Sequence, residues 1–290
     1  MRFDINKLHI AIEEWSKDIP AEDIHIVIPR NDSKKRDHLG LSSLADDCQR
    51  KVFYQFRKVA KPVFPPHVLR LFQRGHREEF FFTHMLTCLG LTIHEVNPKT
   101  GKQFKVSDFE GHLAGSMDGV AVDKEMRFTS STEPFKLEYK TYNLARFKTL
   151  VKAGVKESDP KYYGQVQGYL GYTKWLTGSL FCAVCKDNDS FHFEWIVPDT
   201  TSLEMIRERA ELILNATTPP PGISKRKSHW KCKMCDYADN CFTDIKGYRK
   251  PSVKSCRSCA HATPGLNKTW DCNVGGVYGN LCEKWEDVNR

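Results

Sequence analysis

The sequence predicts a mixed α/β fold, in which a central mixed sheet is flanked by helices and followed by a cysteine-rich C-terminal extension. The order of hydrophobic periodicities is the first indication: helical spacing up to Gly90, alternation from there to Tyr142, and helical spacing again from Asn143. The second is the break TPPPG at 218–222. The third is that seven of the eleven cysteines follow that break.

Composition indicates a globular protein. The chain has 290 residues, of which 40% are hydrophobic and 28% charged, enough for one large domain or a main domain with a small appendage. No apolar run approaches the ~20 residues that span a bilayer, and the start carries acidic residues, so we expect a cytoplasmic protein with no membrane partner. Eleven cysteines in a reducing compartment favour metal or cluster ligation over disulfides. The net charge of +8 supports a polyanionic partner only weakly.

The first third of the chain is predicted to be helical. Apolar residues at helical spacing predict a short amphipathic helix over 5–15, and 20–40 is polar and irregular. Ser43 and a following aspartate resemble a capping box that opens a second helix over 44–59. A third helix is expected from two prolines at 65–66 to Gly90, because proline suits a helix start and glycine a helix end.

Strands are then expected, followed by further helices. Two strands flank a turn at 98–101, and two more extended stretches lead to Tyr142. Asn143 and Pro160 mark the starts of two helices. The remaining predicted elements are a hairpin turning at 187–189 and a closing helix over 201–216.

The stretch FKLEYKT, residues 135–141, carries the chemistry that first suggests a function. On a strand Phe135, Leu137 and Tyr139 share one face, so Glu138 and Lys140 emerge on the other. A half-buried edge strand with a solvated charged face explains this pattern when it is taken alone. Lys136 shares that face, and we expect it to be solvated.

Three other positions change this interpretation. Asp118 lies in the glycine-flanked stretch GHLAGSMDGV, and His76 lies one turn from two phenylalanines of a predicted helix. Carboxylates on neighbouring strands followed by a lysine are the parts that bind Mg²⁺ or Mn²⁺ and activate a water molecule. Taken singly, Asp118 could bond its own backbone, and a buried histidine could be satisfied by a hydrogen bond. Gln165 and Tyr169 share a helix face within an aromatic stripe, where an amide has no packing role.

In this order the motifs resemble the RecB branch of the PD-(D/E)xK nucleases, over roughly residues 42–216. The resemblance rests on four motifs, and it implies a restriction-endonuclease-like core and a metal-dependent DNA exonuclease. Mg²⁺ or Mn²⁺ would be held by His76, Asp118, Glu138 and the carbonyl of Tyr139, while Lys140 orients or activates water. Gln165 and Tyr169 would place the scissile strand, and His112 is a candidate DNA contact. The motif residues are His76 in GHxxE, Asp118 in GxxD, Glu138 and Lys140 in ExK, and Gln165 and Tyr169 in QxxxY.

The cysteines extend the resemblance to the iron-sulfur exonucleases associated with CRISPR adaptation and to stand-alone bacteriophage enzymes. One cysteine upstream and three downstream, namely Cys48, Cys232, Cys235 and Cys241, match their arrangement. A 4Fe-4S cluster takes four thiolates and would tie these segments together, and zinc is the alternative for the same positions. The tail adds Cys256, Cys259, Cys272 and Cys282, which predict a small zinc module with His261 as a possible substitute ligand. Cys88, Cys182 and Cys185 are expected to be packing residues.

Two other functions remain open from the sequence. One is a DNA-binding or assembly module that docks a recombination or single-strand-binding partner. The other is a structural zinc protein. A nicking endonuclease is a variant of the leading nuclease hypothesis. The length without a helicase portion favours a phage-encoded enzyme of DNA recombination, repair or degradation in the bacterial host cytoplasm. The predicted parts are a lead-in at 1–41, the nuclease core at 42–217, a linker with the first cysteine set at 218–248 and the zinc module at 249–290.

Overall fold

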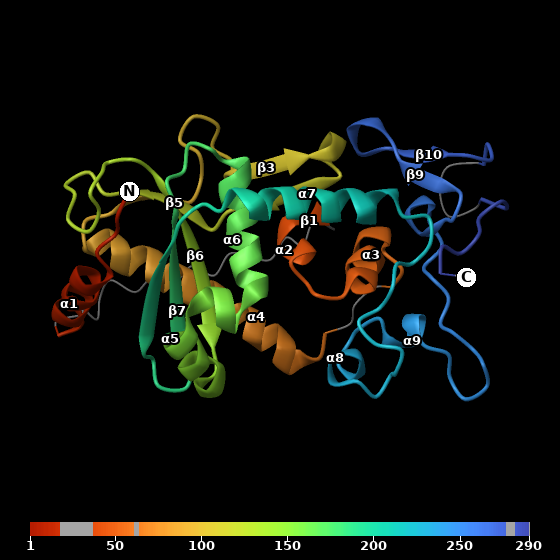
Figure 1. Ribbon diagram of the computed structural model, residues 1–290, viewed down its shortest axis with the longest axis horizontal. Helices are drawn as coiled ribbons and strands as arrows, with labels where there is room; N and C mark the ends of the chain where they lie inside the picture. The colour runs from red at the N-terminus through yellow and green to blue at the C-terminus, as the bar shows by residue number, and fades with distance from the viewer. Residues whose placement is uncertain (18–36, 61–63, 277–281, 290) are drawn as a thin grey trace. The chain divides into compact units, whose positions relative to one another are not determined.

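A computed structural model describes residues 1–17, 37–60, 64–276 and 282–289 (Figure 1). Most of the segment expected to be irregular, 20–40, lies outside these ranges. The chain divides into two compact units that each combine distant segments. We call Met1–Ser33, Phe64–Val106 and Ser116–Leu203 the sheet unit, and Lys34–Val63, Ser107–Gly115 and Glu204–Arg290 the cysteine unit. The predicted part boundaries do not coincide with these units and stay predictions.

The sheet unit is built on a five-stranded mixed sheet with the strand order β2-β5-β6-β7-β8. Strands β6 and β7 are parallel, with Glu138 opposite Phe181, and the other neighbours are antiparallel. The predicted mixed α/β class is therefore confirmed. The strands are β2 (Thr92–His94), β5 (Gly119–Val122), β6 (Phe135–Tyr142), β7 (Ser179–Cys185) and β8 (Phe191–Ile196).

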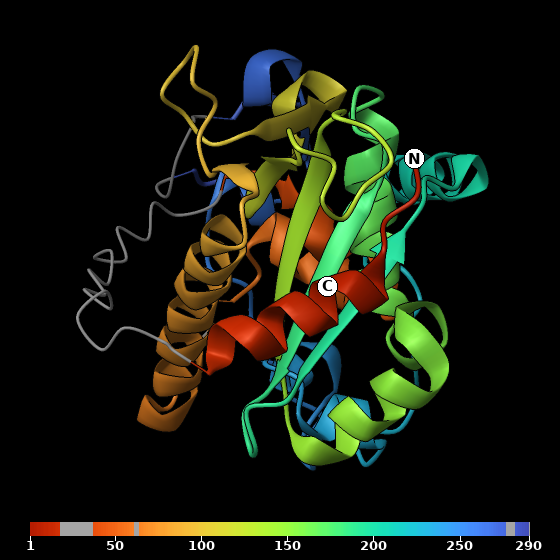
Figure 2. The same cartoon turned by 90° about the vertical axis from the view of Figure 1, so that its left-hand side faces the viewer.

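Helices cover both faces of this sheet. Helices α1 and α4 lie against one face (Figure 2), where the ring of Phe82 stacks on Tyr139 with centroids 5.3 Å apart. Helix α6 supplies Gln165, which reaches Glu138 on the other face. The helices are α1 (Ile5–Ser16), α4 (Pro66–Cys88), α5 (Leu144–Ser158) and α6 (Pro160–Tyr172), and α7 (Thr200–Asn215) spans the boundary between the units.

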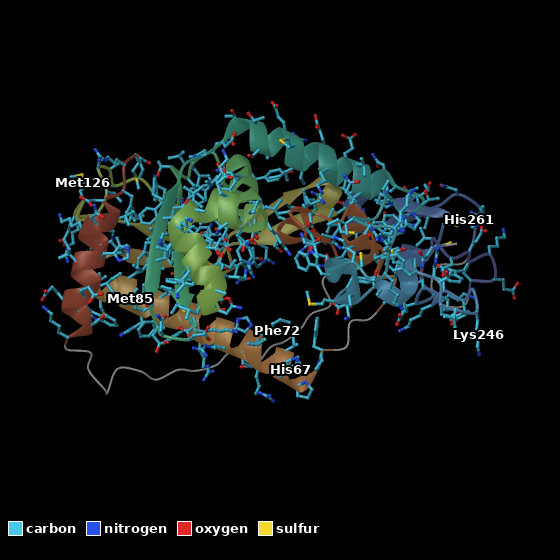
Figure 3. All side chains as sticks on the ribbon, turned by 60° about the horizontal axis from the view of Figure 1, so that its bottom comes forward. His67, Phe72, Met85, Met126, Lys246 and His261 are labelled. Atoms are coloured by element: carbon cyan, nitrogen blue, oxygen red, sulfur yellow. The ribbon has the colours of Figure 1, made fainter. Side chains whose placement is uncertain are left out.

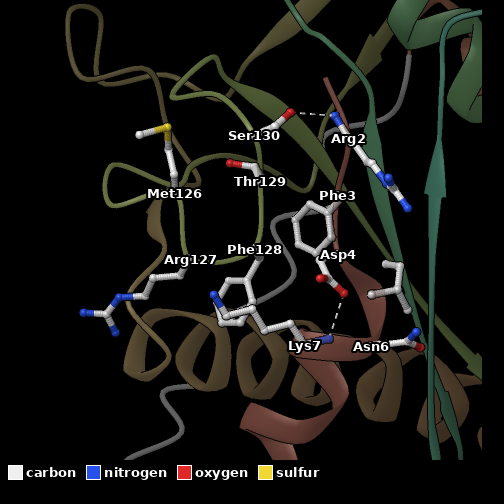
Figure 4. A pocket seen from close by; sticks show the side chains of 11 residues that line it. Arg2, Phe3, Asp4, Asn6, Lys7, Met126, Arg127, Phe128, Thr129 and Ser130 are labelled. Atoms are coloured by element: carbon white, nitrogen blue, oxygen red, sulfur yellow. Dashed lines mark hydrogen bonds between the residues drawn. The ribbon is translucent and has the colours of Figure 1, made fainter.

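The N-terminal segment is fastened to the loop that precedes β6. The backbone N–H of Asp4 donates to the carbonyl of Phe128 at 2.6 Å, and that of Ser130 to the carbonyl of Arg2 at 3.1 Å. Both segments line a surface hollow (Figure 4), which contains none of the predicted site residues. Asp123 accepts hydrogen bonds from the backbone of Phe128 and Thr129 and thereby fixes this loop.

The cysteine unit contains short elements. The helix predicted over 44–59 is present as α3 but begins only at Gln49, because Asp46 accepts a hydrogen bond from the backbone N–H of Cys48 and turns the chain after α2. Strand β1 pairs in parallel with β4, and β9 pairs antiparallel with β10. The elements within this unit are α2 (Leu41–Leu44), α3 (Gln49–Arg57), α8 (Trp230–Lys233), α9 (Ala238–Cys241), β1 (Leu39–Gly40), β9 (Ala262–Pro264) and β10 (Trp270–Cys272). Like α7, the strands β3 (Lys105–Asp108) and β4 (Leu113–Ser116) contain a boundary between the units in sequence.

Candidate active site

Strand β6 brings three charged side chains to the sheet face that α6 covers. Its alternation is as predicted: Phe135, Leu137 and Tyr139 are buried in the apolar core. The expectation that Lys136 is solvated is wrong, because its side chain is 0% exposed and its ammonium contacts the carboxylate of Glu138. The same ammonium lies 5.0 Å from the ring centroid of Tyr169. The charged face of this strand is therefore interior.

Glu138 is the centre of this group. The residue is 1% exposed, and its carboxylate contacts the ammonium groups of both Lys136 and Lys140. The side-chain amide of Gln165 donates to the same carboxylate at 2.8 Å. Burial alone would raise the pKa of Glu138, but the two lysines outweigh burial and the pKa lies below its ordinary value. Glu138 is accordingly held as a carboxylate.

Lys140 is held in the opposite charge state. Burial acts to lower the pKa of its ammonium, but attraction to Glu138 and Asp118 outweighs that effect, so the pKa lies above its ordinary value. Its ammonium also donates to the carbonyl of Tyr139 at 3.1 Å and lies 4.8 Å from the ring centroid of Tyr162. The carbonyl of Tyr139, which was predicted as a metal ligand, therefore lies beside the ammonium of Lys140.

Asp118 lies between β4 and β5 and faces β6. Its carboxylate accepts a hydrogen bond from the backbone N–H of Tyr139 at 3.2 Å, so it does more than close its own turn. Burial raises the pKa of Asp118, and the neighbouring Glu138 raises it further, which outweighs the attraction of the two lysines. A buried carboxylate whose ionised form is disfavoured by a neighbouring carboxylate belongs to a donor set that a divalent cation would stabilise.

Helix α4 contributes both His76 and the glutamate of the same GHxxE motif, Glu79. His76 is about half exposed, and its Nδ1 lies 3.5 Å from the carboxylate of Glu79. Burial raises the pKa of Glu79, and the charge of Asp118 raises it further, while His76 and Lys140 act in the other direction. Glu79 is therefore within electrostatic reach of Asp118 and Lys140. The sequence signal was its position one turn after His76, on the same helix face.

The two remaining motif residues of α6 also face β6. Tyr169 is buried, and its hydroxyl donates to the carbonyl of Ser116 at 2.7 Å. Together with Gln165 it fixes the position of β6 against α6. The structure thus brings Asp118, Glu138, Lys140, Gln165 and Tyr169 together, with His76 joined through Glu79.

His112 lies in the cysteine unit. Its Nε2 is 2.9 Å from the carbonyl oxygen of Gly265, and the residue is 2% exposed. Burial lowers the pKa of this imidazole. The ring packs edge-on against Phe56 and Trp270, with centroids 6.1 and 5.8 Å away. This enclosed position gives no support to a contact with DNA.

The first predicted cysteine set gathers around one cavity of the cysteine unit. Cys48, Cys232, Cys235 and Cys241 all line it. Burial raises the pKa of the Cys232 thiol, and Cys241 and Cys48 raise it further. A guanidinium nitrogen of Arg50 donates to the sulfur of Cys241 at 3.4 Å. Distant segments therefore converge as the spacing predicted.

In the second set, Cys272 and Cys282 border the same glycine. A Cβ at Gly276 would lie 2.8 Å from the sulfur of Cys282 and 3.5 Å from that of Cys272. The backbone N–H of Gly276 donates to Cys272, which lowers the pKa of that thiol. His261, the possible substitute ligand, lies 2.9 Å from a carboxylate oxygen of Glu286.

Other findings limit the metal and cysteine assignments. Among the described residues, no three His, Cys, Asp or Glu side chains are grouped closely enough to hold a metal ion. The cofactor assignments therefore stay predictions. Cys182 and Cys185 are buried as expected, but Cys88 is exposed near the end of α4, so its prediction as a packing residue was wrong. None of the described helices has the length and hydropathy to cross a bilayer.

Comparison with known proteins adds a likeness in fold. No family model and no curated protein matches the chain. Among solved structures, an alkaline exonuclease from Laribacter hongkongensis is similar, with 16% sequence identity and a TM-score of 0.44 over 61% of this chain and 86% of that chain. The same exonuclease in complex with dAMP is similar to the same extent.

Proposed function

We propose that the protein is a divalent-metal-dependent deoxyribonuclease of the RecB-like type, acting as an exonuclease in DNA recombination, repair or degradation. The observation that carries the proposal is the convergence of Asp118, Glu138 and Lys140 at one buried place on β6. A scaffold that only binds DNA has no use for two buried carboxylates beside a charged lysine, whose desolvation is costly. The assembly-module alternative expects no hydrolysis of DNA. The nicking-endonuclease alternative expects cleavage within a strand and not from its end.

The acidic residues supply the metal ligands in this proposal. Asp118 and Glu138 would hold Mg²⁺ or Mn²⁺, assisted by the carbonyl of Tyr139 and by His76 or Glu79 from α4. Oxygen donors suit these hard cations, and the raised pKa of Asp118 beside Glu138 fits a site that gains from added positive charge. When bound, the metal would lower the pKa of a water molecule and screen the charge of the phosphate.

Lys140 and α6 would act on the water molecule and the DNA strand. The ammonium of Lys140 is a donor beside Glu138, positioned to orient an attacking water and to stabilise negative charge at a phosphodiester. Gln165 holds the carboxylate of Glu138 by a hydrogen bond, so its first effect is to fix a metal ligand. Tyr169 packs the same region and would contribute to placing the scissile strand.

The test compares hydrolysis of end-labelled linear single- and double-stranded DNA in Mn²⁺ by wild type, Glu138→Ala and Lys140→Ala. Loss of a metal ligand or of the lysine should lower the rate by about 100-fold or more. Glu133→Ala removes an exposed carboxylate from the same segment and should leave the rate unchanged. Degradation at the wild-type rate in both site variants would refute the assignment.

We propose a 4Fe-4S cluster for Cys48, Cys232, Cys235 and Cys241, with zinc as the alternative, and structural zinc for Cys256, Cys259, Cys272 and Cys282. The first set lines one cavity, which supports a shared metal or cluster there. Cys272 and Cys282 of the second set both border Gly276, which supports a zinc site in that set. Anaerobically purified protein should be brown and contain about four irons, with one zinc besides. A colourless protein with two zinc ions would favour zinc in both sets.

A further inference from the structure

The loop that follows α9 has a tip that is closed by its own hydrogen bonds. The backbone N–H of Asp244 donates to the carbonyl of Tyr248 at 2.7 Å, and that of Gly247 to the carbonyl of Asp244 at 3.1 Å. The Asp244 carboxylate accepts from the backbone N–H groups of Lys246 and Tyr248, both at 2.8 Å. Gly247 has a φ of 77°, which suits glycine after a tight turn. These contacts fix a turn with Ile245 and Lys246 as its central residues.

The turn exposes an isoleucine at a place where turns usually carry polar residues. Ile245 is 102% exposed, the largest fraction among the large hydrophobic side chains of the described residues. Tyr248, in the same loop, is 59% exposed, and Figure 3 shows Lys246 at the edge of the cysteine unit. The backbone is fixed by hydrogen bonds and not by the Ile245 side chain, so that side chain contributes no packing to the fold. We call residues 244–248 the Ile245 loop.

Positive charge accompanies the Ile245 loop. The stretch 223–250 holds eight Lys and Arg residues against three Asp residues, so +5 of the chain's net charge of +8 lies within it. Lys225, Arg226 and Lys246 are exposed and make no ion pair with another described residue. The acidic residue of the loop, Asp244, directs its carboxylate to the backbone. A concentration of exposed positive charge of this kind is the electrostatic signature of a surface that binds nucleic acid.

Asp239 joins the Ile245 loop to a second basic segment, residues 225–227. The ammonium of Lys227 lies 2.9 Å from the Asp239 carboxylate, and the backbone N–H of Lys250 donates to the Asp239 carbonyl at 2.9 Å. Lys227 lowers the pKa of this carboxyl most, and the charge of Lys250 lowers it further. Both lysines are exposed, and neither lines the cavity of the first cysteine set. Their charge is therefore available to a polyanion outside that cavity.

We propose that the Ile245 loop inserts Ile245 between two base pairs of double-stranded DNA, with Lys246 and the neighbouring lysines on the flanking phosphates. An aliphatic side chain on a fixed turn can enter a base step as a wedge, and lysines offset the charge that the DNA backbone brings near. The proposal rests on the nuclease function proposed above, because it adds a second contact with the same substrate. The loop belongs to the cysteine unit, whereas Glu138 and Lys140 belong to the sheet unit.

A second copy of this chain and an acidic protein are the competing occupants. A symmetric dimer through the Ile245 loop would bring Lys246 of one copy near the lysines of the other, and like charges disfavour such an interface. An acidic protein has the complementary charge but offers Ile245 no stacked bases to enter. The solution mass identifies a dimer, and the fluorescence of a base analogue in the duplex reports insertion directly.

The test measures binding of a fluorescein-labelled blunt duplex to the full-length protein by anisotropy, with no divalent cation added so that hydrolysis does not interfere. Ile245→Ala should weaken duplex binding by about tenfold, whereas Ile245→Leu should keep it because leucine is also an apolar wedge. Ile10→Ala, at a side chain that is 66% exposed on α1, is the matched control and should bind as wild type does.

Two further readouts separate insertion from a contact made by charge alone. In a second duplex that contains several 2-aminopurines, whose fluorescence is quenched by stacking, the signal should rise when wild type or Ile245→Leu is bound at saturation. Ile245→Ala should give no rise, because the wedge is absent. Lys246→Gln should lower the slope of log affinity against log salt by about 0.9, whereas Lys99→Gln, in another exposed turn, should leave the slope unchanged.

Equal duplex affinity of wild type and Ile245→Ala overturns the proposal, as does binding of wild type without a rise in 2-aminopurine fluorescence. A dimer that Ile245→Ala converts to monomer with unchanged DNA affinity assigns the loop to a second copy and overturns the proposal too. Because no hydrolysis is measured, failure of the nuclease assignment is seen separately, in the Glu138→Ala comparison. A protein that binds DNA through Ile245 but leaves it intact would support the wedge and refute the nuclease.

Discussion

At the scale of single residues, the centre of the molecule is one carboxylate with two ammonium groups. Glu138 contacts Lys136 and Lys140, and all three lie on one face of β6. The ammonium of Lys136 is a second positive charge beside the buried Glu138. Glu138 can therefore stay ionised without depending on Lys140 alone, which leaves Lys140 available for chemistry. Lys136 thus contacts and helps to hold Glu138, although only Glu138 and Lys140 fall within the ExK pattern.

Lys136→Met is expected to destabilise the protein by about 3 kcal/mol, because breaking a buried ion pair leaves part of the charge on Glu138 uncompensated. Urea unfolding measures the change in the free energy of unfolding. Lys152→Met, at an exposed position of α5, should change this free energy by less than about 0.5 kcal/mol. Equal stabilities of the two variants would show that Lys136 contributes nothing to holding Glu138.

His9 makes stability depend on pH. Burial lowers the pKa of its imidazole, the charge of His192 lowers it further, and Glu13 opposes them only in part. The folded pKa therefore lies below the unfolded value of about 6.5, and the unfolded chain binds a proton more readily. As the pH falls from about 8 to 5, wild type should lose more stability than His9→Gln. Melting temperatures of the two proteins across this range measure the effect, and parallel curves would exclude it.

At the residue level, the short motifs predicted which side chains lie near one another, while their roles stay predictions. Asp118, Glu138, Lys140 and Gln165 lie together because strand alternation and helix spacing fix which way each side chain points. Glu79 belongs to the GHxxE motif with His76, but the burial of Lys136 could not be predicted in that way. That burial comes from α6 packing on the charged face of β6, and a solvated lysine and a buried lysine have the same pattern in a strand.

At the scale of elements, end signals in the sequence predicted boundaries well. Asn143 accepts a hydrogen bond from the backbone N–H of Arg146 at 2.9 Å and caps α5, and Gly90 follows α4 with a φ of +95°. The helix predicted over 44–59 starts five residues later than expected, at Gln49, because the local turn at Asp46 competes with helix formation. Helix α5 continues through Gly154, where its backbone kinks.

The kink of α5 should require glycine at position 154. Its φ of 74° and ψ of 171° belong to a region that only glycine adopts readily, and an added Cβ would lie 3.3 Å from the Glu194 carboxylate, which accepts a hydrogen bond from Val155. Gly154→Ala should therefore cost about 2 kcal/mol of stability. Gly75→Ala, inside α4 with nothing within 4 Å of the added Cβ, should instead add up to about 1 kcal/mol. Denaturant midpoints of both variants measure these changes in stability. If both substitutions shifted the midpoint in the same direction, the special backbone conformation of Gly154 would not explain the effect.

At the scale of the whole molecule, the sequence predicted the class of the fold but could not predict how the segments are shared between units. The order of periodicities gives helices, strands and helices, and the five-stranded mixed sheet agrees with it. The cysteine unit, however, combines Lys34–Val63 with Glu204–Arg290. Such pairing depends on long-range contacts, for example the hydrogen bond from the Tyr54 hydroxyl to Asn289, 235 residues away, for which local patterns carry no signal.

This division leads to a prediction about the cysteines. The backbone passes repeatedly between the units, and Cys48 lies far in sequence from Cys232, Cys235 and Cys241, which line the same cavity. A metal or cluster bound there would cross-link these segments, so its binding energy would stabilise the fold without acting on DNA. Stability and hydrolysis should therefore respond differently to loss of one ligand.

Cys232→Ala should lose the bound metal and at least about 3 kcal/mol of stability, because structural metal binding contributes roughly 10–16 kcal/mol in small metal sites. The fraction that remains folded should still hydrolyse DNA, since Asp118, Glu138 and Lys140 lie in the sheet unit. Cys88→Ala removes an exposed thiol from the sheet unit and should change neither property. Metal content, melting temperature and hydrolysis per folded molecule are measured for both variants. Unchanged metal content and melting temperature in Cys232→Ala would exclude a structural metal at this cavity, whereas loss of hydrolysis without loss of stability would place the cluster in the reaction itself.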